Sequence, residues 1–399
     1  MKTICVAAIG TRGDCYPALA LAGILRKENQ IKILTSPDMV PLFRQQAYDC
    51  CPVGDDFSKV VGSRDIAYYR TQIEAQFDGC RTAVEGADVL VGAGLFYAGR
   101  TLAECFGKPY YHLFFTPQVL QSDAYAPPGI AKPFRGRMHN RLLWKKSFAE
   151  SDFLLKALID RKRGELGLAP IHSVYGYLID QPGTVIALDD RIAEIPGQYA
   201  SRIRQIHTLR FEDPAPLDDA LQAFLDRGSK PVLINFGSAE YAARGYREML
   251  KRTMDTGLGL GHRIVILTKA AANASTKSEN VFFCPYAPHA ALLPKTKAII
   301  HHGGIGTVCA ALGSATPQII MPQVLDQHFF AEVIREKQWG RAVDATGKAF
   351  SLRLGNALRD AVENQAIQKG VTDISRWMNS AQYREEGLQK LRGALPACF

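Results

Sequence analysis

The stretch Ile299–Ile334, IIHHGGIGTVCAALGSATPQIIMPQVLDQHFFAEVI, decides how the fold of this sequence is interpreted. Residues Ala298 to Ile300 have the composition of a buried strand end, and apolar residues follow helical spacing from Thr307 to Leu312. The loop HHGGIG lies between them. A strand that runs through a glycine loop into a helix is the repeating unit of parallel α/β sheets.

The same alternation of strand and helix extends in both directions along the chain. Residues 141–168 are predicted to form a pair of amphipathic helices, and residues 184–189 the last strand of the N-terminal sheet. The other predicted strands are KTICVAAIG (2–10), IKILTS (31–36), ADVLVGAG (87–94), PYYHLFFTP (109–117), PVLINFGS (231–238), RIVILT (263–268) and NVFFCPYAP (280–288). The pattern predicts two doubly wound, Rossmann-like sheets with helices on both faces.

The chain is long enough for two domains. Its 399 residues exceed one comfortable hydrophobic core. The segment 207–230 carries two prolines and several acidic residues between apolar strands, as an exposed connector would. We predict an N-terminal domain 1–210, a linker 211–228 and a C-terminal domain 229–380. A terminal helix 381–399 is expected to pack outside the second sheet or to cross back to the first.

Composition excludes several classes of protein. Hydrophobic residues make up 47% and charged residues 22%, which excludes a disordered or fibrous chain. No apolar run approaches the roughly 20 residues of a membrane span, and the start MKTICVAAIGTRGD does not resemble a signal peptide. We therefore expect a cytoplasmic protein. Its nine cysteines include no Cys-x-x-Cys pair, so reduced thiols are expected and not a disulfide framework or a zinc site.

The net charge of +9 needs a separate explanation. The basic residues are spread out, with local concentrations only at 135–146 and 161–163. A solvated basic surface is the favoured interpretation, and the alternative is attraction to an anionic donor, acceptor or membrane surface. No nucleic-acid-binding motif is present, so small molecules are the expected partners. The oligomeric state is left open.

The loop HHGGIG has the features of an anion site. Glycines allow the main chain to approach a ligand closely, and the start of a helix carries partial positive charge. His302 can donate a hydrogen bond to a phosphate oxygen, while Thr307 can add its hydroxyl and cap the helix. The alternative is a tight turn with a capping threonine.

Asp326 and Gln327 follow the predicted strand PQIIMP (317–322) and therefore lie at the carboxyl edge of the sheet, where open α/β folds bind ligands. A carboxylate beside an amide can hold adjacent sugar hydroxyls, because the first accepts and the second both donates and accepts. The alternative role of Asp326 is that of a helix N-cap.

Several segments together resemble a known family. YAPHAALLP (286–294), HHGGIGT (301–307), ALGSATPQIIMP (311–322) and DQHFFAEVI (326–334) resemble, in order and spacing, the donor-binding region of GT-B nucleotide-sugar glycosyltransferases of the bacterial antibiotic and sterol types. GTRGDCYPALALAGIL (10–25) and NFGS (235–238) resemble the openings of their two domains. Resemblance is weak at 55–85 and 118–140, where the family builds its acceptor pocket. The resemblance implies two Rossmann-like domains that face a central cleft.

The resemblance also implies roles for individual residues. The diphosphate would be held by His302, Thr307 and the backbone at Gly303, Gly304 and Gly306, with Ser238 approaching from a facing loop. Tyr286 would lie against the nucleobase beside the backbone of Ala287, and Asp326 and Gln327 would hold the sugar. Ala310 stands where many UDP-dependent members carry a ribose-binding Glu, which favours dTDP, although sterol-type members that use UDP-glucose resemble this chain there.

The catalytic base implied by the resemblance is Asp14, at the position of the catalytic His of many members. It would deprotonate an acceptor hydroxyl for a single displacement with inversion. The alternative is that Asp14 caps the helix and pairs with Arg12; Arg12 and His112 are also candidate acceptor-binding residues. No metal and no cofactor are expected, since there is no Asp-x-Asp motif. The expected acceptor is a small hydrophobic or aromatic natural product. A lipid or sterol glycosyltransferase and a non-catalytic nucleotide-binding protein remain alternatives.

Overall fold

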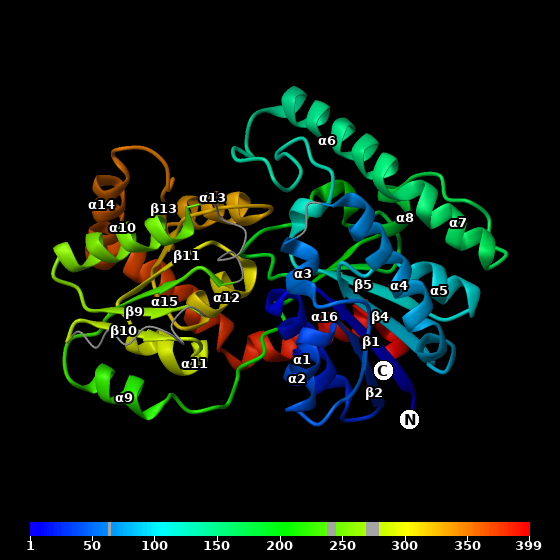
Figure 1. Ribbon diagram of the computed structural model, residues 1–399, viewed down its shortest axis with the longest axis horizontal. Helices are drawn as coiled ribbons and strands as arrows, with labels where there is room; N and C mark the ends of the chain where they lie inside the picture. The colour runs from blue at the N-terminus through cyan, green and yellow to red at the C-terminus, as the bar shows by residue number, and fades with distance from the viewer. Residues whose placement is uncertain (63–64, 238–244, 269–278) are drawn as a thin grey trace. The chain divides into compact units, whose positions relative to one another are not determined.

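The computed structural model describes residues 1–62, 65–237, 245–268 and 279–399 (Figure 1). The chain forms two compact units, the first made of Met1–Phe211 with Glu385–Phe399 and the second of Glu212–Arg384. The end of the chain is held within the first unit, where Lys2 Nζ donates to the backbone oxygen of Ala397 at 2.8 Å. Among the described helices, none combines the length and the apolar character that crossing a bilayer requires.

The first unit is built on a parallel sheet of seven strands in the order β3-β2-β1-β4-β5-β6-β7. The predicted strand at 184–189 is present but is not the last, because a short strand of mostly polar residues follows it. The strands are β1 (Thr3–Ile9), β2 (Gln30–Thr35), β3 (Asp49–Pro52), β4 (Val89–Gly94), β5 (Tyr110–Phe114), β6 (Thr184–Ala187) and β7 (Arg204–Ile206).

Helices cover this sheet because its strands are apolar on both faces. In β1, alternate residues such as Cys5 and Ala7 pack in a core with Phe77 of α4, while Val6 is buried on the other side. The helices are α1 (Arg12–Leu25), α2 (Val40–Arg44), α3 (Phe57–Gly62), α4 (Ile66–Glu85), α5 (Gly99–Cys105), α6 (Arg137–Ser151), α7 (Ala157–Glu165) and α8 (Val174–Leu178), with short turns η1 (Pro37–Met39), η2 (Pro117–Val119) and η4 (Gly197–Tyr199).

The predicted pair of helices at 141–168 is one continuous helix. A π-helical segment, η3 (Asp152–Lys156), joins α6 to α7 with helical backbone angles on both sides. The prediction of a pair was wrong because Ser151 and Asp152, the residues that could have capped a second helix, keep helical backbone angles, and Ser151 makes no cap hydrogen bond.

The second unit contains a parallel sheet of six strands in the order β10-β9-β8-β11-β12-β13. Its strands are β8 (Val232–Asn235), β9 (Ile264–Leu267), β10 (Val281–Cys284), β11 (Ala298–His301), β12 (Gln318–Ile320) and β13 (Gly340–Ala342). Its helices are α9 (Asp219–Asp226), α10 (Tyr246–Gly259), α11 (His289–Leu292), α12 (Ile305–Gly313), α13 (Gln327–Glu336), α14 (Phe350–Glu363) and α15 (Gln365–Met378), with a short turn η7 (Leu293–Lys295). Helix α16 (Ala381–Ala394) begins in this unit and continues into the first, which also contains the short turn η8 (Pro396–Cys398).

Helices also cover both faces of this second sheet. Val232 and Ile234 of β8 pack on the side of Leu354 in α14, and Leu233 packs on the side of Leu221 in α9. The predicted class, two parallel α/β sheets of the doubly wound type, is confirmed.

Strand order determines where ligands can bind. The order reverses between β1 and β4 in the first sheet and between β8 and β11 in the second. In open α/β sheets, ligands bind outside the carboxyl ends of the strands at such a switch point. The loops that follow these four strands are therefore the expected ligand-binding sites.

Candidate active site

The loop between β11 and α12 is shaped by two glycines. Gly303 has φ 92°, and a Cβ there would come within 2.6 Å of Ile320 Cγ2. Gly304 is the N-cap of α12, and a Cβ there would come within 2.5 Å of His302 Nε2. The helix begins at Ile305, earlier than predicted, so Thr307 lies within its first turn and is not the cap. The amides of Ile305 and Gly306 thus open the helix without an intrahelical acceptor.

His302 lies at the centre of this loop. Burial lowers the pKa of His302 to about 4; a hydrogen bond to the backbone of Asn235 acts against this shift, and His289 adds to it. The ring is therefore uncharged at neutral pH. Its Nδ1 is buried and has no hydrogen-bond partner among the residues that the structure describes. A buried polar atom without a partner, beside an open helix start, is what an anion site requires before its ligand arrives.

The neighbouring His301 differs from His302 in its hydrogen bonds. It is fully buried, its Nε2 lies 3.0 Å from Gln318 Oε1, and its Nδ1 accepts from the amide of Gly303 at 3.2 Å. The two imidazole centroids are 6.2 Å apart with planes at 87°. His301 therefore shapes the glycine loop and leaves His302 as the histidine with a nitrogen to offer a ligand.

Residues in the turn after β8 pack against His302. Asn235, the last residue of β8, has its Nδ2 2.9 Å from His289 Nε2 and accepts from the amide of Gly237 at 2.9 Å. A Cβ on Gly237 would lie 3.0 Å from His302 Cε1, so this turn packs directly on the ring. Neither Asn235 nor His289 was predicted; the signal available was only their position at strand and helix ends. Ser238, predicted to approach the diphosphate, lies outside the described residues.

Asp326 and Gln327 lie at the start of α13, after β12. Asp326 occupies the N-cap position of α13, the alternative role, but it has helical backbone angles and its side chain makes no cap hydrogen bond. Gln327 Oε1 accepts from the amides of Gln323 at 2.8 Å and Val324 at 3.0 Å. The amide of Gln327 therefore fixes the loop that presents Asp326.

Tyr286 and Ala287 follow β10. The Tyr286 ring is 39% exposed, and its hydroxyl donates to Asp213 Oδ2 at 2.5 Å. Ala287 is buried among the apolar residues under this edge. The aromatic face of Tyr286 is thus held at the surface by its own hydroxyl, where a flat ring could stack on it. Ala310 lies within α12, partly buried.

Asp14 lies at the carboxyl edge of the first sheet, in the turn from β1 to α1. The helix begins at Arg12, and Pro17 lies inside it. Thr11 is the N-cap, and Asp14 completes a capping box by accepting from the Thr11 amide at 2.8 Å. Asp14 thus contributes to capping as the third helical residue, while Thr11 is the N-cap.

The surroundings of Asp14 are tight. Its Oδ2 would lie 2.2 Å from a Cβ on Gly10, and its Cβ 3.1 Å from one on Gly94, which has φ 66°. Burial raises the pKa of Asp14 to about 6, against hydrogen bonds from Thr11 that lower it. A carboxylate with a pKa near neutrality is suited to accept a proton. This close approach of Gly94 to Asp14 was not predicted from the sequence.

His112 lies in β5, next to β4. Its Nδ1 is 2.7 Å from Tyr110 Oη and its Nε2 3.2 Å from the Gly94 carbonyl, and its ring stacks on Phe114. Burial lowers its pKa to about 4. Because both nitrogens have partners, His112 supports the Gly94 turn that packs on Asp14. Arg12 is exposed at the first position of α1.

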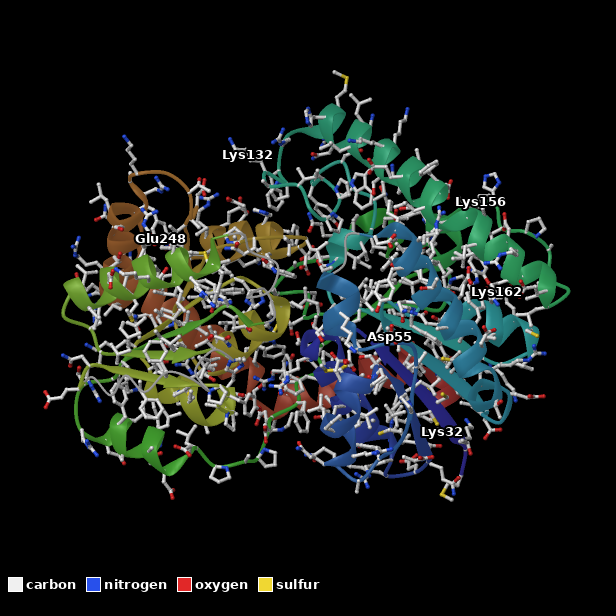
Figure 2. The ribbon with its side chains drawn as sticks, viewed as in Figure 1. Lys32, Asp55, Lys132, Lys156, Lys162 and Glu248 are labelled. Carbon is white, nitrogen blue, oxygen red and sulfur yellow. The ribbon has the colours of Figure 1, made fainter. Side chains whose placement is uncertain are left out.

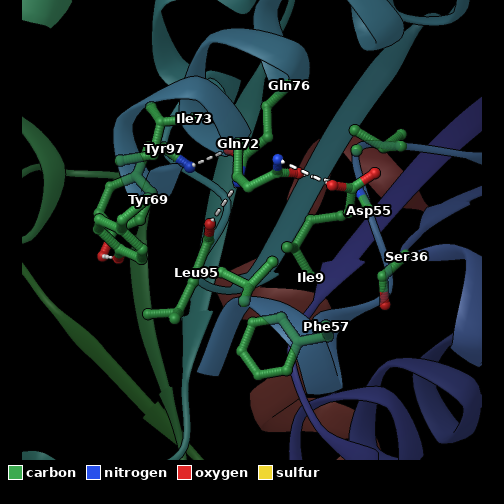
Figure 3. Close-up of a pocket in the computed structure, with 13 residues that line it drawn as sticks. Ile9, Ser36, Asp55, Phe57, Tyr69, Gln72, Ile73, Gln76, Leu95 and Tyr97 are labelled. Carbon is green, nitrogen blue, oxygen red and sulfur yellow. Dashed lines mark hydrogen bonds between the residues drawn. The ribbon is translucent and has the colours of Figure 1, made fainter. Parts of the chain in front are cut away.

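A small pocket also opens at the carboxyl edge of the first sheet (Figure 3). Its volume is about 30 Å³, enough for one or two waters. Gln76 of α4 donates through Nε2 to the Leu95 carbonyl at 2.9 Å and accepts from the Tyr97 amide at 2.8 Å, and the hydroxyls of Tyr69 and Tyr97 are 2.8 Å apart. Much of its lining comes from 53–76, in the region of weak resemblance. The feature of the sequence that could have predicted this pocket was Gln76, a polar residue among the buried residues of α4.

Among the described residues, no cluster of three or more His, Cys, Asp or Glu side chains is placed to hold a metal ion. The two arrangements described above are instead an open helix start beside a histidine whose Nδ1 has no partner among the described residues, in the second unit, and a buried carboxylate in the first. The first suits an anionic group and the second suits proton transfer.

Comparison with known proteins finds relatives of this chain. A family model described as the C-terminal domain of erythromycin biosynthesis protein CIII-like proteins matches residues 251–392. The vancomycin aglycone glucosyltransferase of Amycolatopsis orientalis is 29% identical over 374 residues, covering 89% of this chain and 90% of that protein. A sterol 3-beta-glucosyltransferase of Arabidopsis thaliana is 25% identical over 416 residues, covering 94% of this chain and 65% of that protein.

Among solved structures, the spinosyn forosaminyltransferase SpnP matches with a TM-score of 0.73 and 15% identity, over 99% of each chain. This likeness shows the GT-B fold. The chain is a glycosyltransferase of that fold, related to the antibiotic glycosyltransferases and the sterol glucosyltransferases.

Proposed function

We propose that this chain transfers a sugar, with inversion, from a nucleoside diphosphate sugar to a hydroxyl of a small hydrophobic or aromatic natural product. The relatives that include an antibiotic-aglycone glucosyltransferase support the natural-product acceptor. The observation that carries the donor assignment is His302, whose buried Nδ1 has no partner among the described residues beside the open start of α12.

In the proposed complex the diphosphate lies at this helix start. The amides of Ile305 and Gly306 donate to its oxygens, and the helix dipole opposes its charge. A phosphate oxygen at Nδ1 supplies the partner that His302 lacks, and a nearby anion favours the protonated ring, in which both nitrogens donate. These groups stabilise the leaving diphosphate, so no divalent ion is required.

The sugar and the nucleobase are assigned to other loops of the second unit. Asp326, presented by the loop that Gln327 holds, binds sugar hydroxyls, and the face of Tyr286 supports the nucleobase. We favour dTDP over UDP because Ala310 replaces the ribose-binding Glu that the resemblance leads one to expect in UDP-dependent members.

Asp14 accepts the proton of the acceptor hydroxyl as the hydroxyl oxygen attacks the anomeric carbon and the bond to the diphosphate breaks. Its buried carboxylate has a pKa of about 6, so it is mostly ionised at pH 7 and still basic enough to take a proton. A single displacement of this kind inverts the anomeric configuration.

The sterol relative supports a second candidate, a lipid or sterol hydroxyl as acceptor. A screen separates the candidates: dTDP- and UDP-sugars are incubated with pooled aromatic, polyketide, lipid and sterol acceptors, and glycosylated products are identified by mass. The anomeric configuration of the product, determined by NMR, tests inversion. Nucleotide binding without any glycosylated product in such a screen would favour a non-catalytic binding protein.

A further inference from the structure

Helix α6 and the segment before it carry a concentrated positive charge. Residues 131–149 contain six lysines and arginines and no aspartate or glutamate. All six of these basic side chains are exposed: Lys132, Arg135, Arg137, Arg141, Lys145 and Lys146. The concentration of basic residues seen in the sequence at 135–146 therefore gives this part of the chain a basic surface.

The same face of the helix exposes large apolar side chains. Met138 is 79% exposed, Leu142 62% and Phe153, in the continuing π-helical segment, 80%. Met138 and Leu142 are four residues apart, and Phe153 follows eleven residues later, so the three form one stripe along the helix. Large apolar side chains gathered on one solvent-facing stripe mark an interaction surface.

The opposite side of α6 anchors it to the first unit. Trp144 is buried and its Nε1 donates to the Tyr125 carbonyl at 2.9 Å, and Asn140, also buried, donates through Nδ2 to the Asp123 carbonyl at 2.9 Å. These contacts fix the rotation of the helix, so the stripe of Met138 and Leu142 is held facing away from the core.

Few acids offset the charge of this face. Asp123 pairs with Arg141 at 2.5 Å, and Glu150 lies 3.6 Å from Lys146. Six basic residues less these two acids leave a charge of +4. Further along the same helix, Lys156 and Lys162, labelled in Figure 2 with Lys132, are paired with acids. The charge surplus therefore coincides with the apolar stripe.

We infer that this face of α6, formed by the six basic residues and the stripe Met138, Leu142 and Phe153, docks on an anionic phospholipid surface. A basic, interfacially placed helix buries apolar side chains at the boundary of headgroups and acyl chains while its cations contact anionic headgroups. Lysine and arginine can do both, because their stems lie on apolar surface and their ends reach the headgroups. An acidic protein surface would satisfy the cations but would leave the apolar stripe in water.

The test needs no substrate and is independent of the proposed function. The full chain is sedimented with vesicles of phosphatidylcholine alone and with vesicles in which about one third of the lipid is phosphatidylglycerol. We expect binding to the anionic vesicles only, weakening as NaCl is raised, because salt screens exposed charges. Equal binding to both vesicle types, or none to either, would overturn the inference.

Variants test the two components of the face separately. Replacing Lys145 and Lys146 by Glu should weaken vesicle binding at least about 25-fold, since each basic residue near such a surface contributes about fivefold. Replacing Leu142 or Phe153 by Ser should weaken it about tenfold each, from lost apolar burial. All these positions are exposed, so circular dichroism spectra and Tm should stay close to those of the parent.

Matched controls lie on other helices. Lys251→Glu with Lys369→Glu makes the same charge change at two exposed helical lysines of the second unit, and Leu352→Ser removes an exposed leucine of α14. Both controls should bind vesicles nearly as the parent does. A loss in the controls as large as in the α6 variants would show that net charge or general hydrophobicity, and not this face, governs binding. Concentration-dependent dimers that dissociate in Leu142→Ser, without vesicle binding, would assign the face to a second copy instead.

Discussion

The turn after β1 and the turn after β11 both carry a parallel strand through glycine into a helix, but they treat the start of that helix in opposite ways. In the first turn Thr11 caps α1 and Asp14 completes the capping box, so the helix start is filled by the protein's own side chains. In the second turn the cap is Gly304, which has no side chain, and no acid lies in the first turn of α12.

This difference separates two kinds of chemistry on the same local fold. A helix start closed by a carboxylate repels a second anion, but it holds that carboxylate where burial raises its pKa, as for Asp14. A helix start left open keeps its amides and its dipole for an external anion. The turn in the first unit is therefore suited to a base, and the turn in the second unit to a diphosphate.

The largest expected effect separates the two roles of Asp14. Asp14→Asn keeps an oxygen that can accept from the Thr11 amide but cannot take a proton, so turnover should fall by about two to four orders of magnitude while donor affinity is retained. Kinetics with one acceptor at saturating donor measure the first quantity, and calorimetric titration with nucleotide measures the second.

Stability should move in the opposite direction. The folded-state pKa of Asp14 is raised, so the unfolding free energy of the parent falls as pH rises from about 4 to 6 and Asp14 ionises. Removing the charge in Asp14→Asn should therefore raise the unfolding free energy at neutral pH by about 1–2 kcal/mol. The control is Asp218→Asn, at the N-cap of α9, which should leave turnover unchanged. Near-normal turnover of Asp14→Asn would assign the base to another residue.

The next effect concerns the open turn. His302→Ala should weaken nucleotide binding about ten- to a hundredfold, the range expected for one hydrogen bond to a charged group. The matched control is His262→Ala, a half-buried histidine of the same unit that precedes the amino end of β9. Unchanged nucleotide affinity in the His302 variant would contradict the donor assignment.

One glycine variant in each turn tests whether the two turns have separate roles. Gly10→Ala would place a Cβ 2.2 Å from Asp14 Oδ2, and Gly304→Ala would place one 2.5 Å from His302 Nε2. We expect a loss of about tenfold or more in each, in turnover for Gly10→Ala and in donor affinity for Gly304→Ala, because displacing a functional group by about 1 Å is costly. Gly164→Ala, where a Cβ meets no atom within 4 Å, is the control. Identical kinetic defects in both variants would argue against separate roles.

The pH dependence is a milder test of the closed turn. If ionised Asp14 is the base, turnover at saturating donor should rise about tenfold between pH 5 and pH 7, along a limb with an apparent pKa of about 6. The residual turnover of Asp14→Asn should lack this limb. A limb that persists in the variant would show that another group titrates.

The smallest expected effect is none at all. Because amides, the helix dipole and His302 are proposed to stabilise the leaving diphosphate, EDTA should leave turnover within error of the untreated rate. Loss of activity in EDTA with recovery on adding manganese would require a metal in the open turn.

The alternation of strands and helices was readable because a parallel strand buried on both faces must be apolar throughout, as in Val232–Asn235. The same rule explains why β7 (Arg204–Ile206) was not predicted, because it is an edge strand of three residues with two polar side chains. The glycine loop at 302–304 could be predicted from the sequence because its backbone angles and close contacts admit few residues other than glycine. Local chemistry, recorded in neighbouring residues, determined these features.

The hydrogen-bond partners and the protonation that distinguish the two turns were decided only by tertiary structure. No spacing in the sequence distinguishes His301 from His302; the difference arises because Gln318, on the neighbouring strand β12, occupies one of them. The raised pKa of Asp14 likewise depends on its burial against Gly94, which follows in sequence by eighty residues but lies on the adjacent strand β4. Burial and hydrogen bonding act between strands that the fold brings together. The sequence alone therefore indicated candidate residues, while their protonation and hydrogen-bond partners were set by neighbours distant along the chain.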